Sequence, residues 1–93
     1  MIRLVVGARV GKTLQRLGPE VAAETEKQLL KVAAQFGQPH QHSGLGLRKL
    51  GPRSYEIRVW RQWRVVFIQD GETLFAFDVM NHDEVELWLK RKR

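Results

Sequence analysis

The sequence of 93 residues contains no cysteine. This absence excludes disulfide bonds, thiolate zinc sites and cysteine nucleophiles, and it fits a reducing compartment. Long apolar runs are also missing, since none approaches the ~18 residues that a membrane-spanning helix needs. The apolar stretch in residues 1–7 is too short for the apolar region of a signal peptide. We therefore expect a cytoplasmic protein that does not enter a membrane and whose core holds without covalent cross-links.

Acidic residues are in the minority, because ten Asp and Glu stand against sixteen Lys and Arg, which gives a formal net charge of +6. An excess of positive charge favours RNA, DNA, anionic lipid or an acidic protein as partner and does not choose among them. The hydrophobic content of 43% and the charged content of 28% are near globular averages, which argues against a disordered chain. A chain of this length has room for one domain, 1–93.

The first half of the chain predicts a strand, two helices and a loop. Residues 2–6 are rich in β-branched side chains, as strands are. Apolar residues recur at helical spacing over 8–17 and over 20–36, and the Gly-Pro pair at 18–19 separates the two helices because Gly ends a helix and Pro suits the first turn of the next. The stretch 37–52 collects Gly, Pro, His and Gln and predicts a loop that packs back onto the domain.

The second half predicts a three-stranded antiparallel meander and a short helix. Residues 55–60 alternate with period two, 64–69 are nearly all β-formers, and a hairpin turn at 70–71 leads into 73–80. The last stretch, 83–92, has helical apolar spacing and basic residues at its C-terminal end, where the helix dipole favours them. We therefore predict a small α+β domain in which the N-terminal strand and the meander complete a four-stranded sheet.

Two registers are open for the first hairpin of the meander. A three-residue loop at 61–63 places Glu56, Arg58 and Arg64 on one face of the sheet. A two-residue loop moves Arg64 to the other face and gathers a larger apolar set for the core. That set is Tyr55, Ile57, Val59, Val66, Ile68, Phe75, Phe77 and Val79. The sequence does not choose between the two registers.

Four segments carry a family resemblance. In chain order they are Leu47-Arg48-Lys49-Leu50, Tyr55-Glu56-Ile57-Arg58-Val59, Trp63-Arg64-Val65-Val66-Phe67 and Asp78-Val79-Met80-Asn81-His82. Together with the order of strand, two helices, meander and short helix, they resemble the RelE/ParE superfamily of toxins from type II toxin–antitoxin systems. The resemblance covers nearly the whole chain. It implies a toxin that a cognate antitoxin neutralises in an oligomeric complex. One branch of the superfamily cuts mRNA in the ribosomal A site, and the other poisons DNA gyrase. Because both branches share one fold, the fold does not distinguish between these activities.

The resemblance implies catalytic positions of the mRNA-cleaving branch. Arg58 and Arg64 match basic residues that hold phosphate, and His82 falls on an acid–base position. Glu56 is either the general base or an ordinary strand residue. Trp88 falls on an aromatic position that stacks on substrate.

The chemistry of these side chains agrees with ribonucleolytic transfer, which needs a base for the 2′-hydroxyl, cations for the phosphorane oxygens and an acid for the leaving oxygen. Arginine makes bidentate phosphate contacts, and histidine changes protonation near neutral pH. Further basic residues close in sequence extend the predicted RNA-binding surface: Arg48, Lys49, Arg53 and Arg61. The competing interpretation is that these are solvated strand and loop charges.

The expected function is a ribosome-dependent mRNA endoribonuclease, an RNA-binding hydrolase of the mRNA interferase type that inhibits translation and arrests growth. We expect no metal and no cofactor, because the His40 and His42 pair lacks a convincing third ligand. The alternative is a non-nucleolytic gyrase poison or an attenuated toxin that acts as a binding module with its antitoxin. Two departures from the family pattern favour this alternative: Asp83 stands where many relatives have a basic residue, and no Tyr follows His82.

Overall fold

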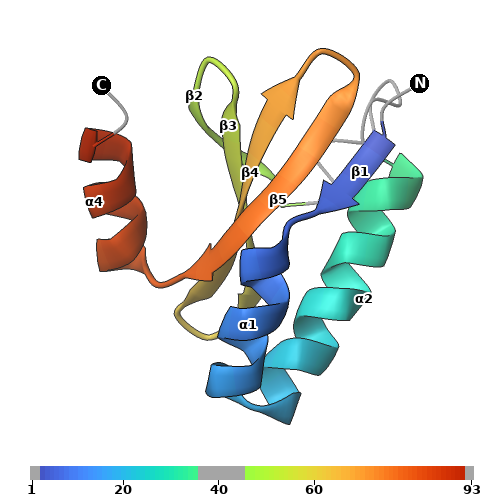
Figure 1. Ribbon diagram of the computed structural model, residues 1–93, viewed down its shortest axis with the longest axis vertical. Coiled ribbons are helices and arrows are strands. Elements are labelled where there is room, and N and C mark those ends of the chain that lie inside the picture. The colour runs from blue at the N-terminus through green and yellow to red at the C-terminus, as the bar shows by residue number, and fades with distance from the viewer. Residues whose placement is uncertain (1–2, 36–45, 92–93) are drawn as a thin grey trace.

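The structure, a computed structural model, describes residues 3–35 and 46–91. In this part of the chain, three helices cover a five-stranded sheet with the strand order β1-β5-β4-β3-β2 (Figure 1). The elements are β1 Arg3–Val6, α1 Ala8–Leu17, α2 Pro19–Gln35, β2 Arg48–Gly51, β3 Ser54–Trp60, β4 Trp63–Asp70, β5 Thr73–Met80 and α4 His82–Arg91. The predicted α+β class and the predicted order of strand, helices, meander and terminal helix are confirmed.

The predicted loop over 37–52 is wrong in its last part, and the sheet has five strands rather than four. Strand β2 pairs antiparallel with β3, with Arg48 opposite Glu56 and Lys49 opposite Tyr55. The four residues of β2 have little β propensity of their own, so pairing with β3 decides their conformation. Residues 36–45, which include the histidine pair, lie outside the described residues.

Strand β1 lies parallel to β5, while the other neighbouring strands are antiparallel. The chain leaves β1 for α1 at Gly7, where the backbone passes close to β5. A Cβ atom built on Gly7 would lie 2.6 Å from Cζ of Phe75 and 3.0 Å from the carbonyl oxygen of Ala76. Only glycine fits this close approach without a shift of its neighbours.

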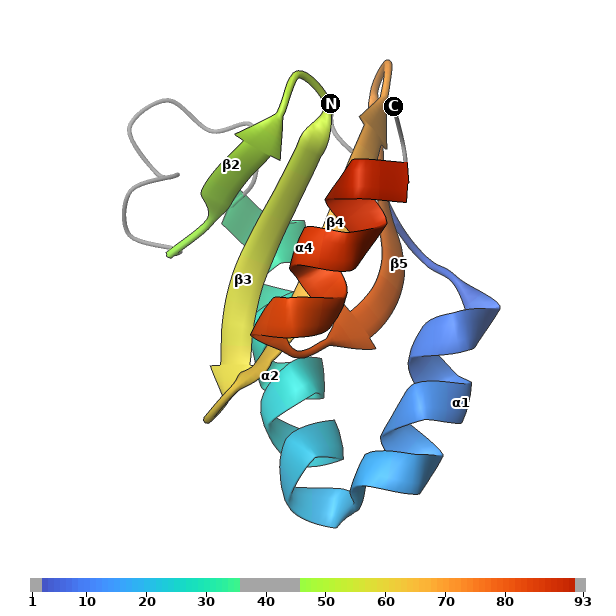
Figure 2. The same ribbon diagram turned by 90° about the vertical axis from the view of Figure 1, so that its left-hand side faces the viewer.

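The two faces of the sheet carry separate cores. Helices α1 and α2 cover one face and α4 lies over the other (Figures 1 and 2). The larger core, under α1 and α2, contains Val10, Val21, Val32, Ile57, Val59, Val65, Phe67, Leu74, Ala76 and Val79. The smaller core, under α4, contains Val66, Met80 and Val85. Among the described helices none is long and apolar enough to cross a membrane.

The hairpin between β3 and β4 combines features of both predicted registers. Its turn has two residues, Arg61 and Gln62, and Arg61 has a positive φ of 49°. The register shifts between Arg58 and Trp60, so that Arg58 still lies opposite Arg64. The prediction that a two-residue turn moves Arg64 to the other face is therefore wrong. A β-bulge between Arg58 and Trp60 accommodates one extra residue on β3 and so keeps Arg64 on the face of Arg58.

Candidate functional site

Four charged side chains from three neighbouring strands lie on the α4 face of the sheet. They are Arg48, Glu56, Arg58 and Arg64, called the charged cluster below. Opposed residues of antiparallel strands point to the same face, as do residues two apart on one strand. Arg48 and Val66 both lie opposite Glu56, and Val66 is buried in the core beneath α4. The sheet register thus brings the cluster together on that face.

Glu56 and Arg64 form the inner part of the cluster. Oε2 of Glu56 lies 3.5 Å from Nε of Arg64, and the two side chains are only 8% and 12% exposed. The same oxygen lies 3.6 Å from Nη1 of Arg48, whose side chain is 71% exposed. Glu56 is therefore held between one nearly buried and one solvated guanidinium group. Nη1 of Arg64 is buried and has no hydrogen-bond partner among the described residues.

Arg58 completes the cluster as an exposed cation. It lies directly opposite Arg64 across β3 and β4. Like charges at opposed positions destabilise a sheet. Glu56 offsets the charge of Arg64, whereas within the described part of the chain Arg58 has no ionic partner. With three cations around one carboxylate, the cluster is suited to an anionic ligand such as a phosphate group.

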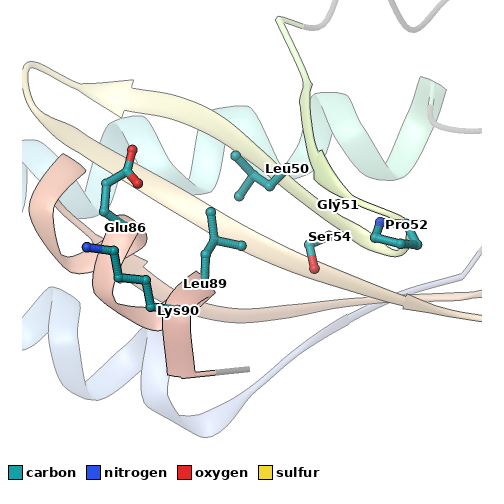
Figure 3. A pocket seen from close by; sticks show the side chains of 7 residues that line it. All are labelled: Leu50, Gly51, Pro52, Ser54, Glu86, Leu89 and Lys90. Atoms are coloured by element: carbon teal, nitrogen blue, oxygen red, sulfur yellow. The ribbon is translucent and has the colours of Figure 1, made fainter. Parts of the chain in front are cut away.

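A cleft also lies beneath α4, on the side of the sheet that α4 covers (Figure 3). It is a cavity of about 550 Å³ between the β2–β3 hairpin and α4. Its lining residues are Leu50, Gly51, Pro52, Ser54, Glu86, Leu89 and Lys90. Ser54 precedes Glu56 by two residues on β3, which places it on the same face and about 7 Å away along the strand. The four residues of the charged cluster are not among those that line the cleft.

His82 stands apart from the cluster. It is the first residue of α4, is exposed, and has its Nε2 atom 3.6 Å from Oε1 of Glu86, one turn further along the same helix. Met80, the last residue of β5, lies opposite Arg64 of the cluster, and His82 follows Met80 by two residues. Its only described ionic partner is nevertheless Glu86.

The start of α4 carries a capping arrangement that the sequence analysis missed. The backbone N–H of Glu84 donates to Oδ1 of Asn81 over 2.8 Å, and the N–H of Asn81 donates to Oε1 of Glu84 over 2.9 Å. This reciprocal pair satisfies two backbone donors at the helix start. The spacing Asn-x-x-Glu at 81–84 is the signal that predicts it.

Trp88 lies on the opposite side of α4 from the cleft. Its ring stacks on Phe77 with centroids 5.7 Å apart and an interplanar angle of 26°. It is half-buried and packs against the smaller core. The structure therefore places Trp88 outside the charged cluster.

The remaining predicted RNA-binding residues are exposed and dispersed. Lys49 lies opposite Tyr55, which is next to Glu56 on β3. Because neighbouring residues of a strand point to opposite faces, Lys49 points to the other face of the sheet. Arg53 lies in the turn between β2 and β3, and Arg61 lies in the next turn with its guanidinium carbon 5.5 Å from the centroid of a Trp60 ring. No group of three potential metal ligands occurs among residues 3–35 and 46–91.

Comparisons with known proteins assign nothing to this chain. No protein-family model matches it, and a search of curated proteins finds no significant match. Function is therefore argued from the side chains of the site.

Proposed function

We propose that this protein is the toxin component of a type II toxin–antitoxin system and cleaves mRNA on the ribosome. The observation that carries the proposal is the charged cluster, in which exposed Arg58 lies opposite Arg64 and Glu56 contacts Arg64 at 3.5 Å. The resemblance to RelE/ParE toxins in the segments around these residues adds support.

The cluster has the groups that RNA cleavage needs. Arg58 and Arg64 bind the non-bridging oxygens of the scissile phosphate, and this anion competes with Glu56 for Arg64. The freed Glu56 carboxylate then takes the proton of the 2′-hydroxyl. The 2′-oxygen bonds to phosphorus while the bond from phosphorus to the 5′-oxygen breaks. His82, exposed at the start of α4, donates the proton to the 5′-oxygen, and the products are a 2′,3′-cyclic phosphate and a 5′-hydroxyl.

The antitoxin is proposed to bind on the other side of the molecule, over a groove between β1, α1 and α2. Val6 and Leu30 line this groove with exposed fractions of 49% and 66%. Thr25 also lines it, and its buried Oγ1 has no described hydrogen-bond partner. Exposed apolar side chains of this size favour a protein partner, and the net charge of +6 favours an acidic one.

The backbone of β1 suits the same partner. The N–H groups of Arg3 and Gly7 donate to carbonyl groups next to and within β5. Because backbone groups alternate along a strand, those of Leu4 and Val6 point away from β5. Within the described sheet β1 is an edge strand, so an extended antitoxin segment can pair with it.

A non-nucleolytic binder is the second candidate. The described ionic partner of His82 is Glu86, and no described ion pair joins His82 to the charged cluster. Without an acid in contact, the cluster binds an anionic partner and does not cleave it. This is the form that a gyrase poison or an attenuated toxin takes.

The test is to induce the protein in a bacterial host, follow growth and map mRNA 5′ ends. Arg58→Ala is the main variant, because its side chain is exposed and has no described ionic partner. We expect cleavage to fall by about 100-fold, as for the loss of one transition-state donor. Arg16→Ala is the matched control, since Arg16 is an exposed arginine in the last turn of α1.

The outcomes separate the candidates. New in-frame cleavages that disappear in Arg58→Ala and persist in Arg16→Ala support the ribonuclease. Growth arrest with intact mRNA and damaged DNA supports the gyrase poison. Cleavage that is unchanged in Arg58→Ala and in Glu56→Gln rules out the cluster as the active site.

A further inference from the structure

One carboxylate oxygen of Glu56 contacts two guanidinium groups. Oε2 lies 3.5 Å from Nε of Arg64 and 3.6 Å from Nη1 of Arg48. The two partners differ in their surroundings, because the side chain of Arg64 is 12% exposed and that of Arg48 is 71% exposed. Arg64 is thus held within the sheet, whereas Arg48 approaches the carboxylate from the solvent.

The proposed cleavage takes one of these partners away from Glu56. When the scissile phosphate binds Arg64, Glu56 loses its nearly buried counter-charge at the step in which it acts as the base. The side chain of Glu56 is only 8% exposed, and RNA bound at the cluster excludes water further. A charged group that is removed from water without a partner costs much free energy. The base therefore needs a second cation during the reaction.

Strand β2 supplies this second cation. Arg48 lies directly opposite Glu56 in the antiparallel pair of β2 and β3, and such opposed side chains start from Cβ atoms about 4.5–5.5 Å apart. Glu56 is the only ionic partner of Arg48 among the described ion pairs. Because β2 is at the edge of the sheet (Figure 2), the exposed Arg48 side chain can follow the carboxylate when it leaves Arg64.

We propose that Arg48 is a positioning residue for Glu56, which keeps its ion pair with the carboxylate when the phosphate binds Arg64. The described ion pairs of Glu56 both use Oε2, so Arg48 holds this oxygen while Oε1 takes the proton of the 2′-hydroxyl. Arg48 acts through Glu56 and does not bind the RNA itself. The inference rests on the proposed function, because it concerns the same reaction.

Direct binding of phosphate by Arg48 is the competing interpretation, and the two roles predict different kinetics. Loss of a phosphate ligand weakens substrate binding and raises KM, whereas loss of a positioning contact lowers kcat and leaves KM unchanged. The effect of a positioning residue also depends on the residue that it holds, which a double-mutant cycle measures.

The experiment measures cleavage by the purified full chain of a defined mRNA on bacterial ribosomes, at varied ribosome concentration. We expect Arg48→Ala to lower kcat about 10-fold without a rise in KM, as for the loss of one charge-assisted hydrogen bond. Arg48→Lys restores most of the rate, because an ammonium group also pairs with a carboxylate. Arg16→Ala is the control, since it removes an exposed arginine of α1, and it changes neither constant.

The double-mutant cycle uses Glu56→Gln, which keeps residual cleavage from the remaining groups of the site. In this background we expect Arg48→Ala to change the rate by no more than about 2-fold, because the neutral amide offers no charge for Arg48 to hold. Urea unfolding of each variant verifies that the chains compared are folded.

Each outcome decides the inference. A fall in kcat that is absent in the Glu56→Gln background and is reversed by Arg48→Lys supports it. A rise in KM, a loss that persists in the Glu56→Gln background, or unchanged kinetics in Arg48→Ala overturns the positioning role and leaves the proposed function intact. A wild-type chain that leaves the mRNA whole, or Arg58→Ala that cleaves as fast as the wild type, overturns the proposed function and the inference with it.

Discussion

Nε of Arg64 lies 3.5 Å from Oε2 of Glu56, although the two residues are not opposed in the sheet. Arg64 lies opposite Arg58, and Glu56 lies opposite Val66. The ion pair is therefore a diagonal contact between β3 and β4, and both side chains are nearly buried. Stability and proposed activity consequently depend on the same two residues.

Glu56→Gln is expected to destabilise the protein by about 1–3 kcal/mol, because it leaves the nearly buried guanidinium of Arg64 without its counter-charge. Urea unfolding measures the change. Arg48→Ala removes only the solvated partner of Glu56, whose side chain is 71% exposed, and we expect a loss within about 0.5 kcal/mol. Equal losses in the two variants would contradict the assignment of the buried pair as the stabilising one.

Gly7→Ala and Gly11→Ala are expected to change stability in opposite directions. The new methyl group at position 7 meets Phe75 at 2.6 Å, and the resulting overpacking costs about 1–3 kcal/mol. At position 11, within α1, no atom lies within 4 Å of the new group, and alanine stabilises a helix by about 0.5–1 kcal/mol relative to glycine. Thermal unfolding of both variants tests the close approach of β1 to β5, which is refuted if Gly7→Ala is as stable as the wild type.

Two threonines with buried side chains are expected to respond differently to replacement by valine. Thr13→Val removes the donor that contacts Asp78 at 2.6 Å and should cost about 1–2 kcal/mol. Thr25→Val removes a buried hydroxyl that has no described partner, and it should be neutral or stabilising by about 1 kcal/mol. Chemical denaturation compares the pair. A large loss in Thr25→Val would reveal a partner for that hydroxyl.

Asn81→Ala is expected to weaken the start of α4 by about 1 kcal/mol, because the N–H of Glu84 loses its acceptor. Glu84→Gln keeps an acceptor for the N–H of Asn81 and is the conservative control. Hydrogen exchange of the first amides of α4 reports the effect locally. Similar exchange in wild type and Asn81→Ala would show that the cap contributes little.

Strand β2 shows where local sequence reasoning is insufficient. The neighbours of Arg48–Gly51 include Gly and Pro, and the segment itself has weak β propensity, so a loop is the local expectation. The segment is a strand because β3 offers its edge across a short turn. Its strand geometry also orients Arg48 toward Glu56.

The sequence by itself determined the type and order of most elements, because apolar periodicity and turn residues act over short distances. The expected helix over 8–17 coincides with α1, and the hairpin turn at 70–71 joins β4 to β5. The proposed roles of Arg58 and Arg64 likewise come from sequence segments, which the structure then places opposite each other.

Only the tertiary structure decided which of the candidate residues meet. A bulge between Arg58 and Trp60 keeps Arg64 on the face of Glu56 despite a two-residue turn, and bulges depend on strand pairing rather than on local composition. The helical period of α4, together with its packing on Val66 and Met80, turns Trp88 toward α1 and away from the charged cluster. The sequence names the chemical groups, and long-range pairing and packing determine their distances.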